Sequence, residues 1–228
     1  MTRRQLPSAD VKGEALASLK VLVVDDHANT VRLMSDVLRA AGLGQVYTAT
    51  DGLTARGQLV RQAPDIVFTD WRMPLMDGLE LTRLIRLAAV RPDPTVPNPE
   101  VPIIMVTGHR SAREVEEARE AGVNEFVIKP FTPAALLSRI QLVLTQPRPF
   151  IVSNAYIGPD RRRRTELSYS GPLRRTNDPE EVVDIVERRA ARETISVELE
   201  AMRRLIATRG GVDRATLQMT YRVMQHTR

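Results

Sequence analysis

The sequence lacks three features that would each point to a particular class of protein. It contains no cysteine, which excludes disulfide bonds and thiol chemistry. No stretch approaches the roughly 18 apolar residues of a membrane-spanning helix. The first 15 residues have no apolar core, so they do not have the pattern of a secretory signal. From these absences we expect a cytoplasmic protein with no membrane partner.

The size and charge of the chain indicate a neutral globular domain followed by a basic extension. The chain has 228 residues, 43% of them hydrophobic, enough for one good core and a smaller appendage. Residues 1–146 carry 17 basic and 17 acidic side chains, whereas residues 147–228 carry 16 basic and 11 acidic ones. The whole formal charge of +5 therefore comes from the second segment, a charge asymmetry that can mark an interaction tail.

Short apolar runs alternate with helical patterns between residues 20 and 145. The expected strands are Val21–Val24, Val46–Ala49, Ile66–Thr69, Ile103–Val106 and Glu125–Ile128, and the expected helices are 28–41, 52–62, 78–89, 112–121 and 133–145. A repeating strand-then-helix order predicts a parallel sheet with helices on both faces. The fold class is therefore α/β, with a five-stranded doubly wound parallel sheet.

Composition also sets the expected domain boundaries. Residues 1–18 are interpreted as a flexible N-terminal arm and residues 19–146 as the α/β domain. Residues 147–177 are rich in Pro, Gly, Ser and Arg without a clear period, so we expect a basic linker there. Residues 178–228 have an apolar stripe at helical spacing, broken at Gly210-Gly211, which predicts a helical extension.

Polar residues follow four of the expected strands at the points where these strands end. They are Asp25-Asp26, Asp70, Thr107 and Lys129-Pro130. The carboxyl ends of parallel strands lie along one edge of a sheet, so these side chains should converge there. Clustered carboxylates favour a hard divalent cation such as Mg2+, and a lysine beside them can neutralise a phosphoryl oxygen. The pattern indicates a site for phosphoryl transfer.

Four motifs together resemble the receiver domain of two-component response regulators of the chemotaxis-regulator type. In chain order they are VLVVDD, DIVFTDWRMPLMDGLEL, PIIMVTGHR and AGVNEFVIKPF, within residues 20–144. This resemblance covers a little over half of the chain and implies the flavodoxin-like receiver fold.

The resemblance also implies a role for each site residue. Asp70 resembles the phosphoacceptor, and Thr107 and Lys129 resemble the hydroxyl and the ammonium that contact the phosphoryl group. Phe126 resembles the aromatic switch. The implied metal ligands are Asp25, Asp26, Asp70 and the backbone carbonyl of Arg72, and the implied Lys-Pro bond is cis.

Three local features are less decisive. Gly108 stands where alanine is usual in the family, and glycine there would open the edge of the site or loosen the loop. His27 is interpreted as a loop residue capping the first helix. Tyr156–Arg164 (YIGPDRRRR) has a motif-like look with several open explanations: a solvated linker, a segment docked on the acidic side of the receiver, or a nucleic-acid contact.

The resemblance predicts a response regulator, phosphorylated on Asp70 by a histidine kinase or phosphotransfer protein in a Mg2+-dependent reaction. We expect a phosphoacceptor rather than an enzyme, with output through contacts with a downstream protein; a homodimer is compatible with the sequence. One alternative is a nucleic-acid-binding regulator with a divergent output segment, although helix 178–206 is acidic. Another is a phosphate sink or adaptor. The extension could also cover the output face, the last two helices and the strand between them, until Asp70 is phosphorylated.

Overall fold

A five-stranded parallel sheet forms the centre of the molecule, with the strand order β2-β1-β3-β4-β5. It is seen in a computed structural model that describes residues 17–108 and 111–161. The strands are β1 (Lys20–Val24), β2 (Gln45–Ala49), β3 (Ile66–Asp70), β4 (Ile103–Thr107) and β5 (Glu125–Ile128). The predicted α/β class and its doubly wound sheet are confirmed.

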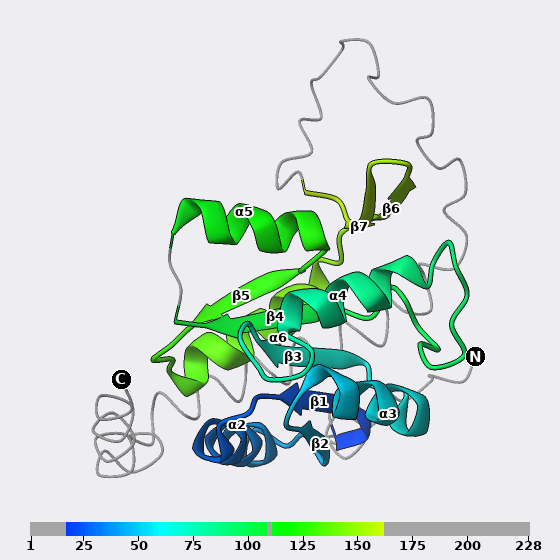
Figure 1. The fold of residues 1–228 in the computed structure, drawn as a ribbon. Coiled ribbons are helices and arrows are strands. Elements are labelled where there is room, and N and C mark those ends of the chain that lie inside the picture. Colours follow the sequence, from blue (N-terminus) through cyan, green and yellow to red (C-terminus); the bar gives the residue numbers. More distant parts are fainter. Residues whose placement is uncertain (1–16, 109–110, 162–228) are drawn as a thin grey trace, which may run out of the picture.

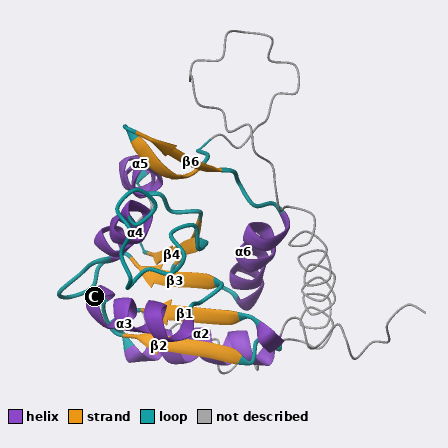
Figure 2. Cartoon of the chain, turned by 90° about the vertical axis from the view of Figure 1, so that its right-hand side faces the viewer, coloured by secondary structure: helices purple, strands orange, loops and turns teal. Residues whose placement is uncertain are grey.

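Helices cover both faces of this sheet (Figures 1 and 2). The helices are α2 (Ala28–Ala40), α3 (Gly52–Gln62), α4 (Gly78–Leu87), α5 (Ala112–Ala121) and α6 (Pro133–Thr145). Side chains of α2 and α6 pack in one core cluster, and those of α3 and α4 pack in another with the opposite sides of the strands. The three central strands β1, β3 and β4 are covered on both faces, so they consist mostly of consecutive apolar residues.

The helices begin and end where the sequence provides caps. The side chains of Asp77 and Ser111 accept hydrogen bonds from the backbone N–H three residues on, and a glutamate completes a capping box in each case. Gly122 ends α5 with a φ of 98°, a left-handed conformation that glycine adopts without strain. The caps at Asp77 and Ser111 begin helices that follow the carboxyl ends of β3 and β4, whereas Gly122 leads the chain back to the start of β5.

The proline-rich segment between α4 and β4, residues 91–102, contains neither helix nor strand. It is nevertheless fixed to the domain. Val96 and Val101 are buried in the core cluster below it. The Arg56 guanidinium of α3 donates to Asp93 and Thr95 of the segment, at 2.9 and 2.6 Å. The segment is therefore part of the packed domain and not a free insertion.

The first part of the predicted linker over residues 147–177 contains a β-hairpin, which the sequence analysis did not predict. Strands β6 (Phe150–Ser153) and β7 (Tyr156–Pro159) pair antiparallel as a hairpin, which Figure 1 shows beside α4 and α5. Each strand has only four residues, and β7 itself contains Gly158 and Pro159. Glycine and proline are unfavourable within strands, so the sequence does not predict this hairpin. The stability of the hairpin therefore depends on its contacts with the receiver.

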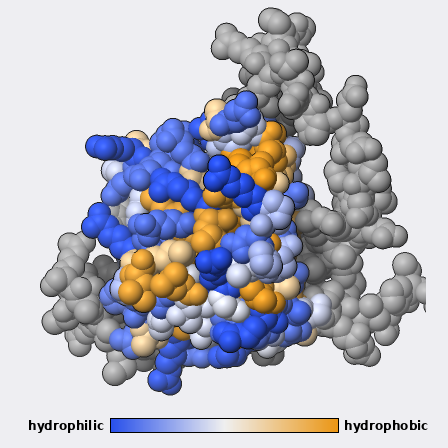
Figure 3. All heavy atoms as spheres, turned by 45° about the vertical axis from the view of Figure 1, so that its right-hand side comes forward, coloured by the Kyte–Doolittle hydropathy of each residue, from blue (hydrophilic) through white to orange (hydrophobic). Residues whose placement is uncertain are grey.

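Several predictions concern segments outside the described residues. These are the arm up to residue 16, the later part of the linker and the helical extension from residue 178. Within the described part, no helix is long and apolar enough to cross a membrane. Exposed large apolar side chains are scattered, and Figure 3 shows orange patches lying between blue hydrophilic side chains.

Candidate functional site

Lys129 joins the two principal carboxylates of the site. It directly follows β5, and its peptide bond to Pro130 is cis, as the resemblance implied. The Lys129 ammonium lies 2.7 Å from an oxygen of Asp25 and 3.1 Å from an oxygen of Asp70. Side chains more than 100 positions apart in the sequence therefore meet at the carboxyl edge of the sheet. The convergence predicted from the strand ends is confirmed for these three residues.

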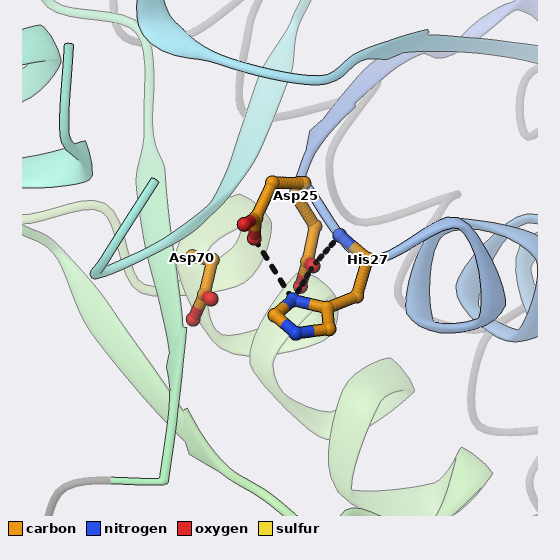
Figure 4. Close-up of side chains that lie close together, drawn as sticks. Asp25, His27 and Asp70 are labelled. Carbon is orange, nitrogen blue, oxygen red and sulfur yellow. Dashed lines mark hydrogen bonds and ion pairs between the residues drawn. The ribbon is translucent and has the colours of Figure 1, made fainter. Parts of the chain in front are cut away.

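The acidic pair after β1 differs in exposure. The side chain of Asp25 is 1% exposed, whereas that of Asp26 is 30% exposed. The His27 backbone N–H donates to Asp25 at 2.8 Å, and its ring Nδ1 lies 2.8 Å from an oxygen of Asp26. Figure 4 shows the His27 ring turned towards the acidic pair that follows β1, with the Asp70 carboxylate near by. His27 occupies the N-cap position of α2, but its side chain makes no capping hydrogen bond.

Asp70 is the last residue of β3 and is 12% exposed. Burial raises the pKa of its carboxyl above the ordinary value, because the charged form loses solvation. The Lys129 ammonium opposes this rise in pKa, and the Asp25 carboxylate adds to it. A nearly buried carboxylate with a cation on one side and an anion on the other is typical of functional sites.

Thr107 and Phe126 lie on neighbouring strands beside these charges. Thr107 ends β4 and is 2% exposed, and its carbonyl accepts a hydrogen bond from the Lys129 N–H at 2.8 Å. Phe126 of β5 is half-buried and packs against a small core cluster that contains Trp71 and Met105. Thr107, the predicted phosphoryl contact, and Phe126, the predicted switch, thus occupy adjacent strands, and their roles stay predictions.

The loop after β3 brings its backbone very close to Asp70. The Gly78 N–H donates to the Trp71 carbonyl at 2.9 Å. A Cβ at Gly78 would lie 2.0 Å from the carbonyl oxygen of Asp70, so only glycine fits there. Arg72 is exposed in the same loop, two residues after Asp70, and the role of its carbonyl stays a prediction. Leu75, 80% exposed with a φ of 66°, lies at the outer turn.

The donor set fits a divalent cation. Asp25, Asp26, His27 and Asp70 each offer one atom, and these atoms lie within 4.8 Å of one another. Three of the four are carboxylate oxygens, the ligand type that suits Mg2+. His27 is the residue that the sequence reasoning missed. Its position next to the acidic pair was the available signal, but that signal is equally typical of a loop residue.

Comparison with known proteins decides the family. Residues 21–141, more than half of the chain, match the family described as the response regulator receiver domain. The chain belongs to this family. Its receiver is of the chemotaxis-regulator type, since chemotaxis protein CheY-3 of Vibrio cholerae is 35% identical over 126 residues. That match covers 55% of this chain and 92% of CheY-3. Chemotaxis protein CheY of Pseudomonas aeruginosa is 37% identical, with 55% of this chain and 95% of the relative covered.

Solved structures similar to this receiver include CheY4 of Vibrio cholerae. The identity is 32% and the TM-score 0.49, covering 55% of this chain and 98% of CheY4. The receiver domain of the sensor histidine kinase PA1611 of Pseudomonas aeruginosa, described with magnesium in its active-site cleft, is 31% identical. Its TM-score is 0.47, covering 54% of this chain and 94% of that domain. Response regulators act in two-component signalling, and receivers of this family are phosphoacceptors.

Proposed function

We propose that Asp70 accepts a phosphoryl group from a histidine of a kinase or phosphotransfer protein, in a Mg2+-dependent reaction. The observation that carries the proposal is the Lys129 ammonium, placed within 3.1 Å of both Asp25 and Asp70. An ammonium at this point can neutralise an oxygen of an incoming phosphoryl group. Charge neutralisation and positioning are most of what phosphoryl transfer requires from a protein.

In the proposed step, a carboxylate oxygen of Asp70 attacks the phosphorus of a phosphohistidine. A P–O bond forms, the P–N bond breaks, and its electron pair returns to the imidazole nitrogen, which takes up a proton. Asp70 must be ionised to attack, and Lys129 favours that form because it lowers the pKa that burial raises.

Asp25, Asp26 and Asp70 would hold Mg2+ with their carboxylate oxygens, and we assign the backbone carbonyl of Arg72 to the same set. When bound, the ion supplies positive charge against the equatorial oxygens of the phosphoryl group. Asp25 is additionally fixed by the His27 N–H and by Lys129, so its orientation is set before any ligand arrives. This preorganisation supports the use of the site for binding a cation and an anion together.

The signal would leave the site through Thr107 and Phe126. A phosphoryl group on Asp70 adds charge beside Lys129, whose N–H is bonded to the Thr107 carbonyl. Movement of Thr107 would change the space available to the half-buried Phe126 ring on the neighbouring strand. Output then takes place through protein contacts of the last helices, a local electrostatic change that biases a two-state element.

The test uses acetyl phosphate and beryllofluoride, each with Mg2+, on the wild-type chain and on Asp70→Asn. We expect a mass gain of one phosphoryl group in the wild type alone. Trp71, the sole tryptophan, is next to Asp70 and 7% exposed, so its emission should report binding at the site. Wild-type protein that gains no phosphoryl group and shows no emission change with beryllofluoride would contradict the proposal.

The alternatives differ in the binding events that phosphorylation of Asp70 would trigger. Salt-sensitive nucleic-acid binding would favour a nucleic-acid-binding output, which depends on residues outside the described part of the chain. Competition with another regulator for one kinase, without any downstream binder, would favour a phosphate sink or adaptor. No contact among the described residues favours either alternative over a protein partner.

A further inference from the structure

The motif Tyr156–Arg161 packs the hairpin of β6 and β7 against the receiver. This motif takes no part in the proposed phosphorylation site, so its role needs another explanation. Tyr156 is 6% exposed, and its hydroxyl donates to the Pro159 carbonyl at 2.7 Å. Gly158 has a φ of 152°, and a Cβ there would lie 2.9 Å from the Cα of Gly122. The backbone of the motif therefore touches the backbone at the end of α5, a fit that a side chain at either glycine would disturb.

Charged contacts hold the hairpin at both of its ends. At its start, the Arg148 guanidinium lies 3.2 Å from Glu125 and donates to the Asp160 carbonyl at 3.3 Å. At its end, the Arg161 guanidinium lies over the Tyr156 ring, 4.6 Å from the ring centre. The end of the hairpin consequently lies beside α5, which β7 contacts (Figure 1).

Arg161 lies next to the acidic side of α5. One of its nitrogens lies 4.0 Å from an oxygen of Glu116. Glu116, Glu117 and Glu120 are all exposed on this helix, and 112–121 contains four glutamates but only two arginines. Arg119 lies 3.5 Å from Glu116, and Arg83 of α4 lies 3.7 Å from Glu117, but these exposed pairs are weak and can be exchanged for others. Exposed carboxylates that outnumber the cations of their own helix favour a basic segment as their partner.

The next three residues of the chain, 162–164, are all arginines. Three extended residues reach about 10 Å, whereas Glu116 and Glu120 are only about 6 Å apart along a helix axis. Arg161 lies at Glu116, so the chain that continues from it starts beside α5. A covalent link of this kind raises the effective concentration of a basic segment near these carboxylates, even though each exposed ion pair is weak.

We propose that Arg162–Arg164 bind across the carboxylates of Glu116, Glu117 and Glu120 in the same molecule. The acidic face of α5 is then an interaction surface occupied by the chain's own arginine run, and other basic partners must displace that run to bind there. This docking does not depend on phosphorylation of Asp70, so it stands or falls separately from the proposed function.

The test is limited trypsin digestion of the full chain, with cleavage after residues 162–164 followed by mass spectrometry. The variant Glu116→Gln/Glu117→Gln/Glu120→Gln should be cleaved about fivefold faster than wild type, as expected when weak exposed ion pairs are lost. Gln forms helices about as well as Glu, so α5 should persist. The matched control is Asp36→Asn, which removes an exposed carboxylate of α2 and should leave the rate unchanged.

A second measurement leaves α5 unchanged and alters the arginines instead, which separates loss of docking from a direct effect of the substitutions on α5. In Arg162→Gln/Arg163→Gln/Arg164→Gln, amide exchange of α5 should be faster than in wild type, with exchange of α2 unchanged. Equal trypsin cleavage of the wild type, the variant Glu116→Gln/Glu117→Gln/Glu120→Gln and the control would overturn the proposal. Unchanged amide exchange of α5 in the arginine variant would overturn it as well. Protection from trypsin only upon addition of an oligonucleotide would also overturn it, and would assign the run to nucleic acid.

Discussion

Lys129 shows how a single residue makes a repulsive site stable. Asp25 and Asp70 are both largely buried, and two such carboxylates would repel each other without a cation between them. The Lys129 ammonium contacts both carboxylates, so it substitutes for part of the positive charge that a bound ion would bring. The repulsion that remains is a cost in stability that favours binding of a cation.

Asp70→Asn should therefore stabilise the folded chain at neutral pH by about 0.5–2 kcal/mol, as expected when a strained functional group is removed. The folded pKa of Asp70 is raised, so its contribution to stability is fully present below the ordinary pKa and is lost as the pH rises. The gain in the variant should grow between pH about 4 and neutrality.

Urea unfolding in the absence of Mg2+, at several pH values, measures this difference. Asp36→Asn on α2 is the control, because its side chain is 65% exposed and should show no such pH-dependent gain. A variant that is less stable than wild type at neutral pH would show that Lys129 more than offsets the cost of burying Asp70.

Two glycines of the site should differ in how an added methyl group affects the rate of phosphorylation. In Gly78→Ala, the new Cβ would meet the Asp70 carbonyl at 2.0 Å, so the phosphoacceptor must move. In Gly108→Ala, the new Cβ has no neighbour within 4 Å among the described atoms. We expect Gly78→Ala to lose roughly 100-fold in the rate of phosphorylation by acetyl phosphate, since such losses follow misplacements of about 1 Å.

Gly108→Ala serves as the matched control, with a rate expected within about threefold of wild type, the ordinary context dependence of a harmless change. Both rates are measured from the mass gain over time. Equal rates for Gly78→Ala and wild type would mean that the loop after β3 moves away without disturbing Asp70.

At the scale of elements, the central sheet and its helices could be predicted because their signals are local. Ile66–Thr69 and Ile103–Val106 are apolar without alternation, and Asp77 and Ser111 mark helix starts with a glutamate three residues on. The meeting of Asp25, Asp70 and Lys129 followed from strand order alone, because the carboxyl ends of parallel strands share an edge. Exposure, the His27 contact and the close approach of Gly78 depend on packing and could not be predicted.

The hairpin lay beyond prediction for a different physical reason. Both strands have only four residues, and β7 contains Gly158 and Pro159, so most of what stabilises the hairpin is supplied by the receiver. The central contact is Arg86 of α4, which is 2% exposed and lies 5.6 Å from the centre of the Phe150 ring. It donates hydrogen bonds to the carbonyls of Gly122, Pro99 and Val101 and to the side chain of Asn124. A buried arginine with four acceptors joins the hairpin region to α4, α5 and the proline-rich segment.

Arg86→Leu should lower the free energy of unfolding by about 2–4 kcal/mol, since buried acceptors would lose their donors. The control is Arg83→Leu on the same helix, whose guanidinium is 54% exposed and lies 3.7 Å from Glu117. That exposed pair should contribute at most about 1 kcal/mol. Denaturant unfolding of both variants gives the comparison, and equal losses would mean that the acceptors of Arg86 are satisfied by water.

At the scale of the whole molecule, the hairpin makes the receiver larger than the segment that matches its family. The family match ends at residue 141, yet ordered contacts continue to Arg161. Arg148 pairs with Glu125 of β5. Burial in the hairpin region raises the pKa of the Tyr156 hydroxyl, because the charged form would lose solvation. The folded unit should therefore include the hairpin, while phosphorylation chemistry needs only the edge of the sheet that carries Asp70.

Two shortened chains test this separation of stability from chemistry. A chain ending after Arg161 keeps the hairpin and its contacts, whereas one ending after Gln146 exposes the surface around Arg86 and loses the ion pair of Arg148 with Glu125. We expect the shorter chain to be less stable by about 2 kcal/mol, a loss typical of uncovering buried polar and apolar groups. Both chains should still gain one phosphoryl group from acetyl phosphate with Mg2+, because the hairpin lies away from Asp70, Lys129 and the acidic pair. Equal unfolding midpoints for the two chains would show that the hairpin packs on the receiver without stabilising it. Loss of phosphorylation in the shorter chain alone would show that the hairpin is coupled to the site at the carboxyl edge of the sheet.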